Sequence, residues 1–268
     1  MKKTMLYDCV CAVFTYILLS FVLVSCSSTG ANNQGELFIK VLDTPANFKQ
    51  LNIVVERVSI HRVGAASDVG WTIVNTNSSG PFDLLNLRNG RNLQLVLNKV
   101  PVGVYDRIKI NYGACTIIKD GPEQSLNLDP SVVNGDSITY GFQIVEGQQL
   151  QLTFDFDASL SIYSTGGMYY FKPVIRVQNT MLSGSIVGSV VRPDTLPNVS
   201  SVHTFTGVDS VTTLLDPNGS FQIADIPENI YTVTILSGDS KLLDTTITNI
   251  IVVRQQISNI GAIVLRNK

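Results

Sequence analysis

Two acidic residues on one predicted strand have the spacing that comes nearest to a chemical site. Along residues 149–157, Gln-Leu-Gln-Leu-Thr-Phe-Asp-Phe-Asp, apolar and polar side chains alternate with the period of a half-buried strand. Asp155 and Asp157 should therefore share one face, roughly 6.5 to 7 Å apart, with Leu152 and Phe154 on the other face. This separation would admit a cation, or the two carboxylates of an inverting glycosidase.

The same two carboxylates have a simpler interpretation. An acid/base pair needs one carboxyl group with a raised pKa, and neighbours on one strand face tend to share a single environment. We therefore expect Asp155 and Asp157 to accept hydrogen bonds from nearby backbone amides, or to pair with Arg107, Lys109 or Arg176. They remain candidates for ligand binding only. The sequence predicts no catalytic residue, no metal site and no cofactor.

The other side chains that could do chemistry are few. Two histidines occur, His61 and His203, and they fall in different predicted domains, which excludes a histidine-based triad or a multi-histidine metal site within one domain. His61 alternates with Ser59, and we expect it to be half-exposed. Trp71, the only tryptophan, follows Gly70 at a predicted strand start. It is either a core residue, the commoner situation, or a platform on which a sugar stacks.

Cys26 closes a segment of a different kind at the amino terminus. Lys2-Lys3 precedes an almost uninterrupted apolar stretch over residues 9–25, which ends in Leu23-Val24-Ser25 immediately before the cysteine. The segment resembles a bacterial lipoprotein signal peptide. The resemblance implies cleavage of residues 1–25, attachment of acyl chains such as palmitate to Cys26, and a body held outside the cytoplasm by a lipid anchor. Because the stretch is almost long enough to span a bilayer, a retained transmembrane anchor is the alternative.

The anchored form sets the expected location and partners. Ser27 stands where some bacteria use aspartate to retain lipoproteins in the inner membrane, which favours the outer membrane and leaves its periplasmic and outward faces open. Loss of residues 1–25 removes two lysines and one aspartate, so that 19 basic and 21 acidic residues become 17 and 20. The basic residues are scattered singly, which excludes nucleic acid as a partner. Cys115 is then the one cysteine left in the body, and we expect it to be a small buried hydrophobic residue.

The rest of the chain has the pattern of two all-β domains. Residues 26–35 hold no large apolar side chain and predict a flexible tether. From residue 36 onward, runs rich in Val, Ile, Leu, Tyr and Phe alternate with turn signals such as Asn89-Gly90 at intervals of about eight to twelve residues. The predicted fold class is all-β, with antiparallel β-sandwich domains over residues 36–180 and 181–268.

Seven segments of the first domain occur in a characteristic order, at residues 41–45, 53–61, 70–71, 83–87, 100–108, 155–159 and 171–176. They include Val-Leu-Asp-Thr-Pro, Asp-Leu-Leu-Asn-Leu and Val-Pro-Val-Gly-Val-Tyr-Asp-Arg-Ile. Together they resemble the DUF4382 family of exported bacterial proteins, which is described only as a domain of unknown function. The resemblance covers roughly residues 36–177. It implies an all-β domain on lipoproteins, without an established activity.

The second domain resembles another family through four segments, at residues 184–191, 216–223, 226–233 and 252–265. They look like the strands of a carboxypeptidase-regulatory-like, or prealbumin-like, β-sandwich. That family commonly has glycine just before the Tyr-Thr-Val strand, where this chain has Asn229-Ile230. Asparagine tolerates the left-handed backbone, so the turn is expected to survive. The resemblance implies a stalk or accessory module of the carbohydrate-binding-like group.

Three functions from different classes follow from these observations. The leading hypothesis is a non-enzymatic cell-envelope lipoprotein that displays β-sandwich domains for structural or protein-interaction purposes, and an unrecognised hydrolase is the least favoured. The alternative is a carbohydrate-binding surface lipoprotein, with a glycan contacting Trp71, the Asp155 and Asp157 face, or the exposed members of Tyr163, Tyr169 and Tyr170. A concave aromatic cleft would indicate sugar binding, flat sheet faces with an apolar patch would indicate protein partners, and a deep acidic pocket would indicate an enzyme.

Overall fold

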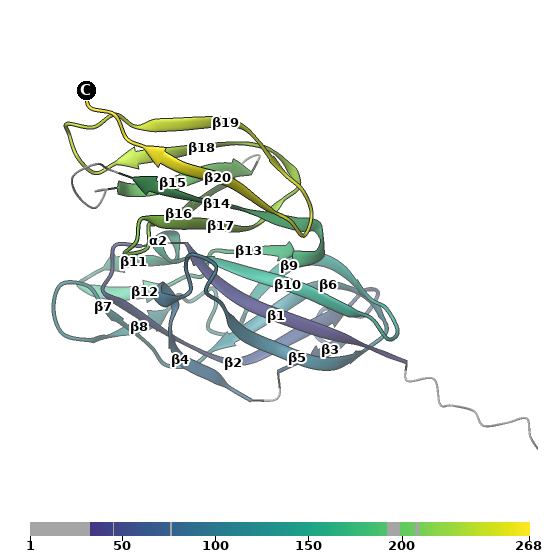
Figure 1. Cartoon of the computed structure of the whole chain (residues 1–268). Helices are drawn as coiled ribbons and strands as arrows, with labels where there is room; N and C mark the ends of the chain where they lie inside the picture. Colours follow the sequence, from purple (N-terminus) through teal and green to yellow (C-terminus); the bar gives the residue numbers. More distant parts are fainter. Residues whose placement is uncertain (1–32, 45, 76, 192–198, 207–208) are drawn as a thin grey trace, which may run out of the picture. The chain divides into compact units, whose positions relative to one another are not determined.

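A computed structural model of the 268-residue chain describes residues 33–44, 46–75, 77–191, 199–206 and 209–268. Residues Gln34–Lys268 form one compact unit. Strands dominate, and the helices of the described residues are single turns. These turns are η2 (Leu84–Asn86), α2 (Ala158–Ser161) and η3 (Thr180–Leu182). The predicted all-β fold class is confirmed (Figure 1).

Residues 34–182, here called the first module, form two sheets (Figure 1). Sheet A has the strand order β13 (Ile175–Asn179), β10 (Gln149–Asp157), β1 (Gln34–Thr44) and β5 (Leu93–Pro101). Sheet B has the order β11 (Ile162–Thr165), β12 (Met168–Phe171), β8 (Gln124–Leu128), β7 (Cys115–Ile118), β2 (Gln50–Arg62), β6 (Gly103–Tyr112) and β9 (Asp136–Ile144). Two short strands, β3 (Trp71–Ile73) and β4 (Ser79–Asp83), also pair with β2.

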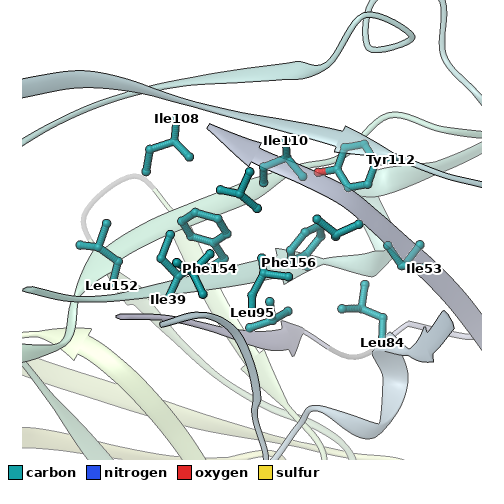
Figure 2. Packing of buried hydrophobic residues seen from close by; sticks show 14 of the residues in the cluster. Ile39, Ile53, Leu84, Leu95, Ile108, Ile110, Tyr112, Leu152, Phe154 and Phe156 are labelled. Atoms are coloured by element: carbon teal, nitrogen blue, oxygen red, sulfur yellow. The ribbon is translucent and has the colours of Figure 1, made fainter. Parts of the chain in front are cut away.

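Sheets A and B enclose one hydrophobic core. Phe154 and Phe156 alternate along β10 with polar residues and are fully buried, as are Ile39 of β1 and Ile108 and Ile110 of β6. Figure 2 shows these side chains gathered in a single cluster. Each such side chain contributes about 1.5 to 3 kcal/mol through its removal from water. The period of two in the sequence is therefore the pattern that builds this core.

Residues 183–268, here called the second module, form two further sheets around a separate core. Sheet C has the order β17 (Ser220–Pro227), β14 (Ser183–Val191) and β20 (Ile257–Val264). Sheet D has the order β16 (Asp209–Thr213), β15 (Val199–Thr206), β18 (Asn229–Ser237) and β19 (Thr245–Val252). The turn at residues 216–219 joins β16 to β17, and the Gly219 amide donates a hydrogen bond to the Asp216 carbonyl. The turn expected from Asn218-Gly219 is present, and it connects sheet D to sheet C instead of closing a hairpin within one sheet.

The two modules share one arrangement of six strands, here called the frame. In sheet A, β1 pairs in parallel with β10 and antiparallel with β5; in sheet C, β14 pairs in parallel with β20 and antiparallel with β17. The antiparallel order β2-β6-β9 of sheet B matches β15-β18-β19 of sheet D. The matching strands also follow each other in the same chain order. The first module adds β3, β4, β7, β8 and β11–β13 to this frame, and the second module adds β16.

Two glycines occupy equivalent places at the start of each frame. A Cβ on Gly35 would lie 2.3 Å from the Val145 carbonyl oxygen, and a Cβ on Gly184 would lie 2.3 Å from the Val253 carbonyl oxygen. Each first strand thus passes too close to a returning backbone for any side chain. β1 begins at Gln34, so Gln34 and Gly35 belong to a strand although they fall in the segment predicted to be a tether.

Two local expectations need correction. Asn229 does not have the left-handed backbone expected of it; in this part of the second module that conformation belongs to Asp225, with φ 50°. His61 is not half-exposed but buried, with 1% of its surface accessible. The burial of His61 arises from the contacts of its ring with Asp106 and Ala66.

Candidate functional site

The two candidate carboxylates of β10 have separate structural tasks. Asp155 lies opposite Arg176 in the β10/β13 pairing, and its Oδ2 accepts a hydrogen bond of 2.7 Å from an Arg176 guanidinium nitrogen. Asp157 caps α2, where its Oδ1 accepts a hydrogen bond from the Leu160 backbone amide at 2.9 Å. Both of the simpler interpretations drawn from the sequence are therefore found, one at each residue.

A third carboxylate, Asp43 of β1, lies close to this pair. Leu42 is the register partner of Asp155, so Asp43 lies beside that position at the end of the core. Among the described residues, neither oxygen of Asp43 has a hydrogen-bond partner of good geometry, and only 5% of the residue is accessible. Burial raises the pKa of Asp43 to about 9, and the Asp155 carboxylate adds to the rise, while the Ala158 backbone amide opposes it. Asp43 is therefore a neutral acid near pH 7.

The sequence analysis missed Asp43, although a signal was present. Leu37, Ile39 and Val41 occupy alternate positions of β1 and face the core, and Asp43 continues that phase. A carboxylate at a core-facing position predicts a buried acid with a raised pKa. The alternation along β1 thus predicts the burial of Asp43 as well as that of the apolar residues.

The space around these carboxylates is small. A cavity of about 20 Å³ is lined by Asp43, Asp155 and Arg88 of the first module and by residues of the second, including Val211 and Thr213. That volume accommodates about one water molecule. In the described part of the chain, no three His, Cys, Asp or Glu side chains are placed to hold a metal ion. The geometry suits a buried structural cluster, not a substrate pocket.

One carboxylate of the second module, that of Asp225, contacts the outer face of sheet A. Asp225 accepts an ion-paired hydrogen bond of 2.7 Å from the Lys40 ammonium and one of 2.9 Å from the Thr153 hydroxyl. Lys40, Thr153 and Asp155 belong to the polar face of sheet A that the alternation placed opposite the core. The strand is thus buried on both faces, because its polar side forms the junction between the modules.

A turn of the first module completes the junction. The Asn89 side-chain oxygen accepts hydrogen bonds from the Thr213 hydroxyl at 2.7 Å and the Gln222 backbone amide at 3.5 Å. Asn89 has φ 55°, and a Cβ on Gly90 would lie 2.3 Å from the Gln222 side-chain oxygen. The Asn89-Gly90 turn predicted from the sequence therefore also contacts the second module, because the missing side chain of Gly90 leaves room for Gln222.

Trp71 lies on the outer face of sheet B and outside the hydrophobic core, contrary to the expectation of a core residue. Its ring is contacted by His61, at 5.0 Å between centroids, and by the Lys109 ammonium, 4.1 Å from the ring centroid. The indole nitrogen donates to the Ser67 carbonyl at 2.9 Å. The ring is already engaged in an aromatic and a cation–π contact, which would have to be displaced before a sugar could stack on it.

Both ring nitrogens of His61 have neighbours at hydrogen-bond distance, and an Arg107 guanidinium nitrogen lies 2.8 Å from Nδ1. Nδ1 lies 2.8 Å from an Asp106 carboxylate oxygen and Nε2 lies 3.0 Å from the Ala66 carbonyl oxygen. The hydrogen bond to His61 lowers the pKa of Asp106, and the Arg107 guanidinium contributes in the same direction. Because both nitrogens are engaged and the ring is buried, the His61 and Asp106 pair orders the surface around Trp71 and does not present a base.

The candidate tyrosines divide between core and surface. Tyr169 packs against the core, whereas Tyr163 and Tyr170 stack with 5.3 Å between ring centroids. The Tyr163 hydroxyl donates to Asp129 at 2.7 Å, which raises the pKa of Tyr163 to about 12. Hydrogen bonds from Ser131 and from Tyr163 lower the pKa of Asp129 to about 2. This tyrosine pair lies on β11 and β12, separated from β2 and Trp71 by β8 and β7.

The candidate residues therefore do not converge on one site. Asp155 and Asp157 belong to sheet A, Trp71 lies beside β2 of sheet B, and the tyrosine pair lies at the far edge of that sheet. Cys26, the predicted lipidation residue, lies outside the described residues. Cys115 is buried, and burial raises the pKa of its thiol, as expected for a small buried hydrophobic residue. Among the described residues, no helix has the length and apolar character needed to cross a bilayer.

Comparison with known proteins identifies a family for the first module. The model of the family described as "Domain of unknown function (DUF4382)" matches residues 34–173. No curated protein sequence matches the chain.

Solved structures give only distant similarities, and several of them are pilin or fimbrial proteins. The minor pilin GBS52 of Streptococcus agalactiae has a TM-score of 0.25 and 10% identity, over 87% of this chain and 96% of the pilin. A D295N mutant of the shaft pilin spaA from Lactobacillus rhamnosus GG has a TM-score of 0.25 and 7% identity, over 88% and 98% of the two chains. A fimbrial protein from Bacteroides ovatus has a TM-score of 0.25 and 9% identity, over 87% of this chain and 50% of that protein. TM-scores this low do not establish a shared overall fold.

Proposed function

The chain belongs to the DUF4382 family, and from that premise we propose that it is a non-enzymatic cell-envelope lipoprotein, anchored through Cys26, which presents β-sandwich modules to a protein partner. The observation that carries the proposal is an exposed apolar face on sheet D.

The apolar face is formed by outward-pointing residues of neighbouring strands. Ile230 of β18 and Ile251 of β19 are register partners, and each has 63% of its surface exposed. Phe205 of β15 is 62% exposed on the same face, because its neighbour Thr204 points into the core. Large apolar side chains gathered on a flat sheet face are typical of surfaces that bind other proteins.

The body beneath this face is held as one unit. Asp225 joins the second module to Lys40 and Thr153, and the Asn89 turn adds a further contact at Thr213. The two candidate carboxylates also stabilise the fold, since Asp155 pairs with Arg176 and Asp157 caps α2. This use of polar residues supports a structural role.

Few residues separate the predicted anchor from the body. Cys26 precedes Gln34, the first residue of β1, by eight positions. A linker of that length spans at most roughly 26 Å when fully extended. We therefore infer that the modules stand near the membrane surface, on the outer membrane as the residue after the cysteine favours.

The anchor is tested by metabolic labelling with an alkyne fatty acid in a bacterial host, followed by mass spectrometry of the purified chain. We expect label on the wild type, none on Cys26→Ala, and undiminished label on the control Cys115→Ala. A mature chain that starts at residue 26 supports the lipoprotein. Label that persists in Cys26→Ala, or a chain that retains residues 1–25, would overturn it.

The partner surface is tested in intact cells with a photo-crosslinking amino acid. Placed at Ile230, it should give one discrete cross-linked protein, and the band should disappear when Phe205→Ser and Ile251→Ser are introduced beside it. The control position is Gln143, an exposed polar residue on β9. Equal cross-linking from Gln143 and Ile230, or none from either, would contradict a specific protein-binding face.

A further inference from the structure

The outer face of sheet C carries a groove that the proposed display function does not explain. Its volume is about 500 Å³, within the range of about 300 to 1,000 Å³ typical of ligand sites. The floor is formed by Val187, Gly188 and Ser189 of β14. One wall comes from β17, with Ser220 and Gln222, and the other from β20.

The groove is hollow where three short side chains meet, because Ser189 lies between Ser220 of β17 and Ala262 of β20. Ser189 of β14 occupies the place that Lys40 has in β1 of the repeated frame, with Ala262 opposite it. On β20 the register shifts between the partners of Val187 and Ser189, so that Asn259, Ile260 and Gly261 form a bulge. Gly261 has φ 75°, and its amide donates to the Asn259 side-chain oxygen at 2.9 Å, which fixes this wall.

The first module supplies the rim. Asn89 lines the groove together with Gln222, and the Asn89 oxygen is held by Thr213 and by the Gln222 backbone amide. The groove therefore lies at the junction of the modules, a common place for binding sites. Its rim exists only when the two modules are docked.

The polar groups of the lining are almost all uncharged. Asn89, Gln222 and Asn259 offer amides, which both donate and accept hydrogen bonds, and two serines offer hydroxyls with the same double capacity. None of the described lining residues is basic. The one carboxylate, Asp216, already accepts hydrogen bonds from the Asn218 and Ser220 backbone amides at 2.9 and 2.8 Å.

We propose that this groove binds a neutral, hydroxyl-rich ligand of oligosaccharide size. Sugar hydroxyls both donate and accept, so each can pair with an amide or a serine of the lining, whereas an anionic ligand would find no cationic partner there. The Val187 and Gly188 floor offers a short apolar strip to the carbon-bound hydrogens of a sugar ring. The site goes beyond the display function, and it lies apart from Trp71 and the tyrosine pair.

The test uses the full chain in detergent and isothermal titration calorimetry. The probes are neutral glucose, mannose and galactose oligosaccharides, with an oligogalacturonate of matched length as the acidic comparison. We expect saturable binding of at least one neutral series and none of the oligogalacturonate. Gln222→Ala and Asn259→Ala should each weaken binding by about 3- to 10-fold, the loss expected for one or two hydrogen bonds. Ser189→Phe, which fills the floor, should abolish it.

Two controls separate this site from others. Gln143→Ala removes an exposed amide on sheet B and should leave binding unchanged, as should Tyr163→Ala on the tyrosine pair. Unfolding curves for every variant show whether a loss of binding reflects loss of the fold. Asn259→Ala also removes the hydrogen bond from the Gly261 amide, so its unfolding curve is compared with that of Gln222→Ala. Binding that is lost with Tyr163→Ala but kept with Ser189→Phe overturns the proposal, as does preference for the oligogalacturonate or silence across all neutral probes.

Discussion

The two modules share a frame but use the same face of it in opposite ways. In the first module, the outer face of sheet A carries Lys40, Thr153 and Asp155 and is buried under the second module. In the second module, the equivalent face of sheet C carries Ser189 and forms an open groove. One frame thus yields a docking surface where its side chains are long and charged, and a cavity where they are short and neutral.

The shared parts of the frame are those that its geometry demands. Gly35 and Gly184 allow the same close approach of two backbones. Tyr105 and Tyr231 each donate a hydrogen bond of 2.8 Å to a carbonyl four residues earlier, that of Pro101 and that of Pro227. The same backbone contacts therefore occur within each module, while the outward-facing side chains differ and determine what each module can bind.

The largest expected effect concerns a residue special to the first module. Asp43 has an ordinary pKa of 3.8 and a pKa of about 9 in the fold, so between these values the folded state holds a proton that the unfolded state has lost. The contribution of Asp43 to the free energy of unfolding should therefore be largest below about pH 4 and fall as the pH rises to about 9, by at most about 1.4 kcal/mol per pH unit.

Asp43→Asn removes this titration and leaves a neutral group of the same shape. Urea denaturation across that pH range should show the wild type losing stability relative to the variant as the pH rises. Parallel pH profiles would show that Asp43 is ionised in the fold or accessible to water. The fluorescence of Trp71, the only tryptophan, reports the first module specifically.

The next effect tests whether the glycine positions are equivalent. Gly35→Ala and Gly184→Ala should each lower the free energy of unfolding by about 3 kcal/mol, because the new Cβ meets a carbonyl oxygen that cannot move freely. Circular dichroism follows both modules, so it can be compared with Trp71 fluorescence. The control is Gly141→Ala, whose Cβ would meet no atom within 4 Å and which should change stability by about 0.5 kcal/mol or less. A large loss at one glycine only would break the equivalence.

A smaller effect concerns the junction between the modules. Asp225→Asn leaves the Lys40 ammonium without its carboxylate and should cost about 2 kcal/mol, less than a fully buried pair because Lys40 keeps 18% of its side chain exposed. Lys40→Met in the same chain should restore at least half of the loss. If the double variant is no better than Asp225→Asn alone, the pair does not hold the modules together.

The smallest effect concerns the two tyrosine hydroxyls. Tyr105→Phe and Tyr231→Phe should each lower stability by about 1 kcal/mol, since each leaves a proline carbonyl without its donor. Tyr163→Phe removes an exposed hydroxyl and provides the control, with a change of about 0.5 kcal/mol or less. Equal losses at Tyr105 and Tyr231 support the repeated frame, and a loss confined to one would limit it.

Much of the fold follows from local pattern. The alternation in β10 and β6 predicts which residues reach the core, and the turn signals at Asn89-Gly90 and residues 216–219 fall between strands as expected. The Arg176 partner of Asp155 was among the predicted pairs, although the sequence left three arginine and lysine positions open. The boundary between residues 180 and 181 stays a prediction, although the two cores on either side are separate clusters.

The rest depended on contacts that no local pattern contains. The burial of His61 depends on Asp106 and Ala66, and the position of Trp71 on Lys109, which belong to different strands or loops. The burial of the polar face of β10 has the same origin, because Asp225 of the second module contacts Thr153 and Lys40 there. Alternation identifies the two faces of a strand but not what covers the outer one.

The sequence by itself determined the fold class, the core-facing residues and the segment before Cys26 from which an anchor is predicted, since each depends on neighbours along the chain. Only the tertiary structure decided that Asp43 is buried as an acid, that Asp225 joins the modules and that sheet C is hollow. These properties arise where side chains from distant strands meet, and their energies depend on burial and on partners that come together only in the folded chain.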